Sequence, residues 1–254
     1  MKVLICTQGV VCHQLIRYLV EKHNIAANDL LVFSYKTHEN IALFSYLKDI
    51  KVRYTTASIC EGTGLELALS FGADIVASAY GREIIPSDVL NNTTIGTFNM
   101  HPSLLPDYRG CFSSPWAIIN GESSTGITFH EMVANVDKGK ILFQKTVPIY
   151  PSDTAFAMYH RLMSEFMSEF NTFFEKFIDG ELEAHDMPPG GSFFYREIPF
   201  GGIIDHSWPE GKIESFIRGM FFPPFRGAIA KFDGSEIEIN TLDQYLTLRE
   251  KCSI

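Results

Sequence analysis

The sequence predicts an α/β fold, in which a Rossmann-like, doubly wound and mostly parallel sheet is followed by a small C-terminal β-rich subdomain. Short apolar runs alternate with segments of helical periodicity through the first half of the chain, which is typical of βαβ units. The composition then changes at a Pro-Pro-Gly-Gly segment, and a strong hairpin pattern follows it. We therefore expect one domain over residues 1–187 and a subdomain over residues 188–254 of the 254-residue chain.

The first half of the chain supplies the parallel strands. Their runs are apolar without alternation, as expected for strands that helices cover on both faces. The first turn contains a single glycine, Gly9, and no G-x-G-x-x-G pattern, so a dinucleotide pyrophosphate site is not supported. Strands are expected at residues 3–6, 30–34, 51–55, 73–79 and 94–100, and helices at residues 10–22, 40–47 and 61–71.

The second half is expected to extend the sheet and then to cover it. A polar turn separates two further strands, which fit an antiparallel extension. A long amphipathic helix carries an aromatic and methionine stripe that indicates core packing, and Ser152 or Asp153 is expected to cap it. A hairpin is expected around Asp233-Gly234. The ranges are helices at 113–120, 153–178 and 213–220, and strands at 126–132, 141–149, 193–198, 203–204, 228–232 and 236–239.

Composition and charge exclude several classes of protein. Hydrophobic residues make up 46% and charged residues 20% of the chain, which argues against disorder. The formal net charge of −9 argues against a nucleic-acid partner. The five cysteines are scattered without a C-x-x-C pair, so we expect no disulfide framework and no metal. The apolar run at the N-terminus is too short for a signal peptide or a membrane span, which predicts a cytoplasmic protein without membrane contact.

Asn99 and His101 are the first candidates for chemistry. They lie two residues apart at the carboxyl end of the fifth predicted strand, so they share one face at the edge where open α/β sheets bind ligands. Histidine can carry a proton near neutral pH, and an Asn amide can donate to a developing oxyanion. A histidine followed by proline is also common in ordinary turns, and the pair alone does not decide between the two interpretations.

The longer run around this pair resembles a family signature. Residues 98–110 read Phe-Asn-Met-His-Pro-Ser-Leu-Leu-Pro-Asp-Tyr-Arg-Gly, which resembles the signature of formyltransferases that use 10-formyltetrahydrofolate. The resemblance implies transfer of a formyl group from that folate to an amine, with Asn99, His101 and Asp137 as catalytic residues. Asp137 matches as an acid in the turn after an alternating strand, whereas outside this context it is an ordinary turn residue.

The resemblance also implies where the folate donor binds. In similar enzymes the pterin is held largely by backbone groups, in a cleft between the loop after the fourth strand and the turn that carries the acid. Gly81 would permit a close approach of the backbone. Arg82 and Glu83 depart from the more apolar loop of some relatives. The donor-binding candidates are Tyr80, Gly81, Arg82, Ile84, Ile85, Val136 and Asp137.

Within this family, the chain most resembles the nucleotide-sugar N-formyltransferases. Its tail is shorter than that of the transfer-RNA enzymes, and it carries an aromatic loop that the glycinamide ribonucleotide enzymes lack. Cys111 departs from the pattern of relatives that formylate UDP-4-amino-arabinose. We expect a dTDP-linked 4-amino-4,6-dideoxyhexose as the acceptor, for O-antigen or lipopolysaccharide biosynthesis. The substrate-binding candidates are Tyr108, Arg109, Tyr195, Arg196, Phe222, Phe225 and Arg226.

Alternatives stay open for the function and for the aromatic loop. Another small amine, such as a ribonucleotide, is a second acceptor class, and a non-catalytic folate-binding sensor or a formate-releasing hydrolase is compatible with the same residues. Phe222 or Phe225 can stack on a base while Arg226 meets a diphosphate. The same aromatic residues can instead seal an interface between copies, and the resemblance implies a homodimer.

Overall fold

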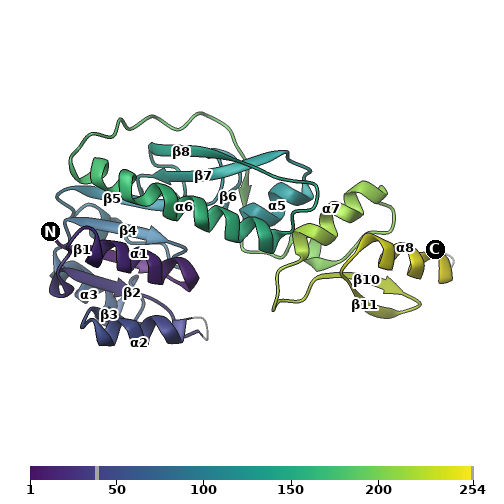
Figure 1. The fold of residues 1–254 in the computed structure, drawn as a ribbon, viewed down its shortest axis with the longest axis horizontal. Coiled ribbons are helices and arrows are strands. Elements are labelled where there is room, and N and C mark those ends of the chain that lie inside the picture. The colour runs from purple at the N-terminus through teal and green to yellow at the C-terminus, as the bar shows by residue number, and fades with distance from the viewer. Residues whose placement is uncertain (38–39, 253–254) are drawn as a thin grey trace. The chain divides into compact units, whose positions relative to one another are not determined.

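The computed structural model describes residues 1–37 and 40–252, and it confirms the predicted α/β class. Within that range, seven strands form one mixed, mostly parallel sheet in the order β3-β2-β1-β4-β5-β7-β8 (Figure 1). The strand order reverses beside β1, as in doubly wound folds. The strands are β1 Val3–Thr7, β2 Leu30–Phe33, β3 Arg53–Thr55, β4 Ile75–Ala79, β5 Gly96–His101, β7 Ser124–His130 and β8 Ile141–Pro148.

The parallel part of the sheet is the buried centre of the fold. All five residues of β1 are buried, and Ile5 lies between Val32 of β2 and Ala77 of β4. β4 and β5 are also parallel, whereas β7 pairs antiparallel with β5 and β8 follows it at the edge. The predicted extension of the sheet is therefore confirmed, and it brings β7 alongside the strand that carries Asn99 and His101.

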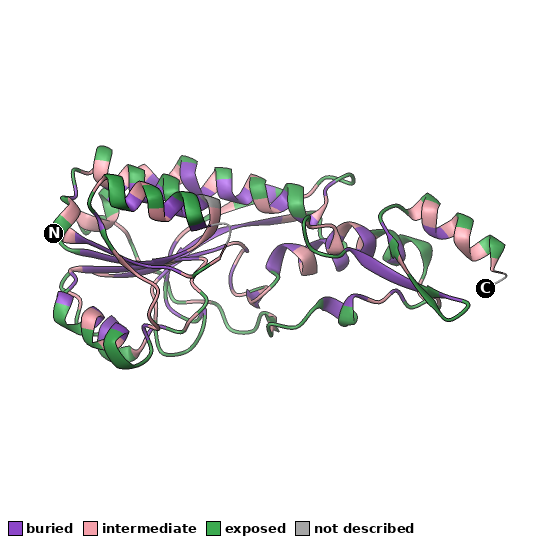
Figure 2. Ribbon diagram, turned by 90° about the horizontal axis from the view of Figure 1, so that it is seen from below, coloured by how far each residue is buried: buried purple, intermediate pink, exposed green. Residues whose placement is uncertain are grey.

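Helices lie on both sides of the strands and turn their buried residues toward them (Figure 2). Boundaries differ from the predicted ones by a few residues, which is the usual uncertainty of helix ends. The α-helices are α1 Gly9–Glu21, α2 Ile41–Asp49, α3 Gly62–Phe71, α4 Ser87–Leu90, α5 Ser113–Ile119, α6 Ala155–Ile178, α7 Glu210–Met220 and α8 Leu242–Lys251, and the 3-10 helices are η1 Ala27–Asp29 and η3 Pro199–Gly202.

The aromatic stripe of α6 packs in the core, as predicted. Phe166 and Phe170 are fully buried. The ring of Phe173 stacks on Phe129 of β7, with 4.0 Å between centroids, and meets Phe98 of β5 edge-on at 5.2 Å. These contacts tie the helix to the two strands that form the candidate site, because aromatic pairs add directional contacts to the burial of their area.

The predicted cap of α6 is wrong. Thr154 precedes the first helical residue, and its Oγ1 accepts a hydrogen bond from the Ala157 backbone N–H at 3.2 Å. Asp153 is buried and binds Arg161 instead, with 2.6 and 2.7 Å between its carboxylate oxygens and the two guanidinium nitrogens. A charged partner on the helix therefore holds the Asp153 carboxylate, and Ser152 does not take the capping position either.

The described residues form two compact units, each built from several chain segments. One unit contains Met1–His101, Thr128–Gln144 and Glu165–Pro188, and the other contains Pro102–Ile127, Lys145–Ser164 and the described chain from Pro189 onward. We call them unit 1 and unit 2. The last change of unit falls between Pro188 and Pro189, inside the Pro-Pro-Gly-Gly segment. A catalytic domain over residues 1–187 with a subdomain over 188–254 stays a proposal.

The C-terminal hairpin is confirmed. Strands β10 Ala228–Phe232 and β11 Ser235–Ile239 pair antiparallel around Asp233 and Gly234. Both turn residues have positive φ, 48° and 78°, which a two-residue hairpin loop of type I′ requires. The hairpin packs with α7 and α8 around a small core that contains Phe216.

The tail differs from the sequence analysis in one predicted strand and one helix that was not predicted. The predicted strand at 193–198 is reduced to β9 Phe193–Phe194, which pairs with the short strand β6 Arg109–Gly110, because the chain turns into η3 soon afterwards. Helix α8 was not predicted, because most of its residues are exposed or half-buried and only Tyr245 is fully buried.

None of the helices in the described ranges is both long and apolar enough to cross a membrane.

Candidate active site

The candidate site begins at the carboxyl end of β5. Asn99 and His101 alternate with the buried core residue Met100, so their side chains share the other face of the strand. His101 is 4% exposed, and Asn99 is half-buried. The antiparallel register with β7 places His130 opposite Asn99 and Thr128 opposite His101. Two neighbouring strands thus deliver an amide and two imidazoles to one place.

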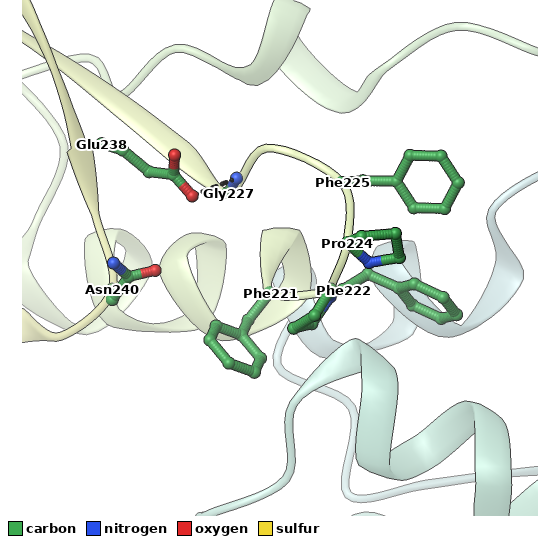
Figure 3. A pocket seen from close by; sticks show the side chains of 8 residues that line it. Phe221, Phe222, Pro224, Phe225, Gly227, Glu238 and Asn240 are labelled. Carbon is green, nitrogen blue, oxygen red and sulfur yellow. Dashed lines mark hydrogen bonds between the residues drawn. The ribbon is translucent and has the colours of Figure 1, made fainter.

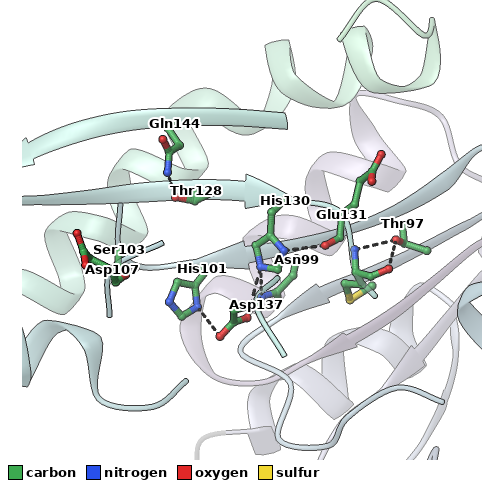
Figure 4. A network of polar contacts seen from close by, with 11 residues as sticks. Thr97, Asn99, His101, Ser103, Asp107, Thr128, His130, Glu131, Asp137 and Gln144 are labelled. Carbon is green, nitrogen blue, oxygen red and sulfur yellow. Dashed lines mark hydrogen bonds and ion pairs between the residues drawn. The ribbon is translucent and has the colours of Figure 1, made fainter. Parts of the chain in front are cut away.

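Asp137 reaches this group from the loop between β7 and β8 (Figure 4). Its Oδ2 lies 3.5 Å from His101 Nδ1, and its Oδ1 lies 3.4 Å from Asn99 Nδ2. The carboxylate is nearly buried, at 9% exposed for the residue. The three residues predicted to act together are therefore neighbours, although Asp137 is remote from the other two in the sequence.

The loop that carries Asp137 is fixed at both ends. The Met132 backbone N–H donates to Thr97 Oγ1 on β5 at 3.0 Å. The Glu131 backbone N–H donates to the Lys140 carbonyl at 2.8 Å. A Cβ at Gly139 would overlap the Glu131 carbonyl, so a glycine is required where the loop returns. These contacts hold the loop that presents Asp137.

His130 is a site residue that the sequence reasoning missed. Its Nδ1 lies 2.7 Å from the Glu131 carbonyl, which can only accept, so Nδ1 carries the hydrogen. Its Nε2 then accepts from the Asn99 amide nitrogen at 3.1 Å, and it lies 3.4 Å from Asp137 Oδ1. The signal was available in the sequence, since His130 ends the alternating strand before Asp137, but only the register with β5 shows its partner.

The arrangement suits acyl transfer to an amine. With Nδ1–H directed to the Asp137 carboxylate, His101 presents Nε2 as a proton acceptor, and the buried carboxylate stabilises the charged imidazole that results. The Asn99 amide nitrogen lies beside it, and the hydrogen that makes the longer contact, 3.4 Å to Asp137 Oδ1, can turn to donate to a developing oxyanion. Burial of His101 and Asp137 strengthens both effects, because charges interact more strongly away from water.

The predicted donor loop, Tyr80–Ile85, is tied to unit 1 by contacts beneath it. The backbone N–H groups of Arg82 and Glu83 donate to the Tyr35 hydroxyl at 2.6 and 3.2 Å. The Glu83 carboxylate accepts from Ser58 Oγ at 2.5 Å, which directs it toward that residue. A Cβ at Gly81 would lie 3.0 Å from the Ser78 hydroxyl, so a larger residue would fit there only tightly.

The side chains of this donor region divide into three groups. Ile84 is 63% exposed and Val136 is 37% exposed, so both offer apolar surface to a ligand. Ile85 is buried in the core and can contribute only its backbone. The third group contains Tyr80 and Arg82. The backbone of Tyr80 has a positive φ of 62°. The Arg82 guanidinium lies over the Tyr35 ring, 5.4 Å from its centroid.

The acceptor candidates at the end of the signature lie in unit 2. The Tyr108 hydroxyl donates to Glu122 at 2.7 Å. Arg109 is 9% exposed, and its Nη2 donates to the carbonyls of Gly190 and Gly191 at 3.2 and 3.5 Å. The guanidinium of Arg109 thus holds the Pro-Gly segment. Tyr195 and Arg196 are exposed beyond that segment.

The aromatic loop after α7 borders a pocket of about 180 Å³ in unit 2 (Figure 3). Phe222 and Phe225 line it, as the stacking hypothesis requires. Arg226 lies between Phe225 and the lining residue Gly227 in the chain and pairs with Glu236 at 3.4 Å. Glu238 and Asn240, which the sequence reasoning did not select, join the lining. The full lining is Phe221, Phe222, Pro223, Pro224, Phe225, Gly227, Glu238 and Asn240.

The side chains of the described ranges contain no group of three or more His, Cys, Asp or Glu residues placed to hold a metal ion.

Comparison with known proteins adds to this geometry. Residues 3–169 match the family model described as formyl transferase. The GDP-perosamine N-formyltransferases of Brucella melitensis and Brucella abortus are 38% identical over 211 residues, which cover 83% of this chain and 81% of theirs.

Two solved structures have the same fold. An N-formyltransferase from Helicobacter canadensis, solved with folinic acid and dTDP-3-aminofucose, has a TM-score of 0.78 and 23% identity, with 93% of this chain and 86% of that chain covered. A sugar N-formyltransferase from Shewanella sp. FDAARGOS_354 has a TM-score of 0.76 and 23% identity, with 94% and 96% covered.

Proposed function

The chain belongs to the formyl transferase family and is an N-formyltransferase, and on that premise we propose that it transfers a formyl group from 10-formyltetrahydrofolate to the amine of a nucleotide-linked amino sugar. The observation that carries the proposal is the buried group of Asn99, His101 and Asp137. Binding a folate alone needs no proton carrier, so this group favours an enzyme over a sensor.

Each of the three residues has a role in the proposed reaction. The acceptor nitrogen attacks the formyl carbon, and His101 Nε2 takes the proton that this nitrogen loses. Asn99 stabilises the oxyanion, and Asp137 stabilises the imidazolium. When the bond between the formyl carbon and the folate nitrogen breaks, His101 returns the proton to that leaving nitrogen, so protons and electron pairs balance over the cycle.

The donor is expected to contact the loop Tyr80–Ile85 and the loop that carries Asp137. Exposed Ile84 and Val136 offer apolar contacts for a pterin ring, and the glycine at position 81 lets the backbone approach closely. The Tyr35 hydroxyl holds Arg82 and Glu83 by their backbone N–H groups, which supports a loop with a fixed shape. A loop already in its binding conformation loses less entropy when the ligand arrives.

The acceptor class is supported by the relatives and by unit 2. The Brucella relatives are named for an amino sugar carried on GDP. Exposed Phe225 and half-buried Phe222 of the loop after α7 suit a nucleotide base, with Arg226 beside them for a diphosphate. A 4-amino-4,6-dideoxyhexose for surface glycan synthesis stays the first choice of sugar. A cytoplasmic location and a homodimer belong to the same proposal.

The test is a panel assay of the full chain. The enzyme and 10-formyltetrahydrofolate are incubated with GDP-, dTDP- and UDP-linked 3-amino and 4-amino sugars, and products are read as the mass of one added formyl group. His101→Ala should lower kcat by a factor on the order of 10²–10⁴. His13→Ala, which changes an exposed histidine on α1, is the matched control. Near-normal turnover in His101→Ala, or formate release without any formylated product, would overturn the proposal.

A further inference from the structure

The pocket of unit 2 is lined by an exposed carboxylate that makes one hydrogen bond to the other described residues. Glu238 lies on β11, and its Oε1 accepts a hydrogen bond from the Gly227 backbone N–H at 2.8 Å (Figure 3). Glu236, two residues earlier, pairs with Arg226 and Lys231, whereas no cation among the described residues pairs with Glu238. A carboxylate has about four acceptor positions, so the bond from Gly227 fixes its orientation and leaves capacity for a ligand.

A second polar side chain lies beside this carboxylate. Asn240 follows Glu238 by two residues and lines the same pocket. A Cβ added at Gly227 would lie 3.2 Å from Glu238 Oε1 and 3.6 Å from Asn240 Oδ1, so the three residues share one wall. The side-chain amide of Asn240 makes no hydrogen bond to another described residue. The wall therefore offers an anchored carboxylate and an amide to whatever enters.

The opposite side of the pocket is aromatic. Phe222 is held edge-on by Phe156 at 5.6 Å and by Tyr159 at 5.4 Å between ring centroids. The Phe221 carbonyl accepts from the Phe156 backbone N–H at 3.1 Å, which ties the loop to α6. Phe225 is 65% exposed, so its ring is available for stacking. A planar ligand with hydrogen-bond donors on its edge fits these walls best.

We propose that this pocket binds the guanine base of a GDP-linked acceptor, and that Glu238 is the residue that selects guanine. The inference rests on the proposed function, and it departs from the dTDP carrier expected from the sequence. Guanine presents two adjacent donors, N1–H and the 2-amino group, which a carboxylate accepts together. The neighbouring O6 can accept from the Asn240 amide.

The other bases match the carboxylate poorly. Thymine and uracil place two carbonyl oxygens on either side of a single N–H, so the carboxylate of Glu238 would face like partial charges. Adenine and cytosine present one amino group next to an unprotonated ring nitrogen, which cannot donate. A carboxylate that accepts from two donors of one ligand therefore prefers guanine to bases that cannot supply both donors.

The experiment is a binding cycle on the full chain. Calorimetry would measure GDP, IDP, dTDP and UDP on the wild type and on Glu238→Gln. IDP lacks only the 2-amino group of GDP. The Gln side chain keeps an acceptor for the Gly227 N–H, so the loop is retained. Glu214→Gln, an exposed glutamate on α7 of the same unit, is the matched control.

The wild type should bind GDP at least about tenfold more tightly than IDP, dTDP or UDP, as expected when a hydrogen bond to a charged group is lost. In Glu238→Gln the preference of GDP over IDP should fall to about twofold or less, while IDP affinity changes little, because the lost bond is the one to the 2-amino group. Glu214→Gln should keep the wild-type preference.

An unchanged preference of GDP over IDP in Glu238→Gln would overturn the assignment, and so would equal binding of GDP and dTDP by the wild type. If the pocket is instead an interface between copies, the substitution would change the sedimentation coefficient and not nucleotide binding, which also contradicts it. Formylation of dTDP-sugars alone would remove the guanine inference and keep the proposed function. Selective GDP binding without formyl transfer would do the reverse.

Discussion

Replacing His130 by leucine tests whether this residue positions Asn99. The imidazole is 2% exposed and makes two hydrogen bonds, one from Nδ1–H to the Glu131 carbonyl at 2.7 Å and one to Nε2 from the Asn99 amide at 3.1 Å. Leucine is apolar and of similar size, so it removes both bonds without a large cavity. Each lost bond costs about 1 kcal/mol, and a buried partner left unpaired costs about 1–3 kcal/mol, so we expect about 2–4 kcal/mol of destabilisation.

The activity of this variant should change in a way that identifies its role. Without His130, Asp137 is the one remaining described residue that holds the Asn99 amide, which can then rotate away from the reacting carbonyl. Loss of a positioned oxyanion donor costs up to about 10²–10³ in kcat, and we expect roughly 10–100-fold here because Asn99 itself remains. The KM values should stay near those of the wild type. The pH dependence of kcat/KM should keep its shape, since His101 remains the proton carrier.

The assay pairs chemical denaturation with steady-state kinetics. His130→Gln, which keeps one donor and one acceptor, should recover part of both losses, and His13→Leu controls for a histidine to leucine change at an exposed position. The reasoning is refuted if His130→Leu retains the wild-type kcat while its free energy of unfolding changes by less than about 0.5 kcal/mol. A changed pH profile in His130→Gln would instead make His130 a proton carrier.

Two further predictions follow from contacts outside this group. Tyr35→Phe removes the hydroxyl that accepts from the backbone N–H groups of Arg82 and Glu83. The KM for 10-formyltetrahydrofolate should therefore rise about ten- to thirtyfold with kcat unchanged. Steady-state kinetics with the donor as the varied substrate checks this, and an unchanged KM would contradict it. Asp153 is buried, which opposes ionisation of its carboxyl group, but hydrogen bonds that include those from Arg161 outweigh this effect and lower its pKa. The ionised carboxylate therefore stabilises the fold above about pH 4, and this contribution is lost as the pH falls through the pKa of the folded state. Asp153→Asn should therefore cost about 2 kcal/mol at pH 7 and progressively less in denaturant titrations between about pH 5 and pH 3, whereas a pH-independent cost would contradict the ion pair.

The sequence identified the aromatic residues of the pocket beside the loop after α7 but not its carboxylate, Glu238. Phe222 and Phe225 were selected because aromatic residues beside an arginine suit a nucleotide. Glu238 was assigned to a hairpin strand and to nothing else, because an exposed glutamate on a strand has no local feature that distinguishes it. The orientation of its carboxylate depends on Gly227, whose backbone N–H donates to it across the hairpin. That contact is set by the register of β10 and β11.

The sequence by itself determined the features that depend on local order. Apolar runs separated by amphipathic segments specify parallel strands covered by helices, because burial on both faces excludes polar residues. The spacing of Asn99 and His101 places them on one face, since side chains alternate along a strand. The pair Asp233-Gly234 specifies a tight hairpin, because both residues tolerate positive φ.

Only the tertiary structure decided which distant groups meet. Asp137 joins His101 because β7 returns antiparallel beside β5 and the following loop is fastened there, and the same register gives His130 its partner. Arg109, a substrate-binding candidate, donates to the carbonyls of Gly190 and Gly191, a contact that its own neighbours in the sequence do not encode. Local periodicity follows from the geometry of one segment, whereas these contacts follow from how separate segments pair and pack, and no short window of sequence contains that information.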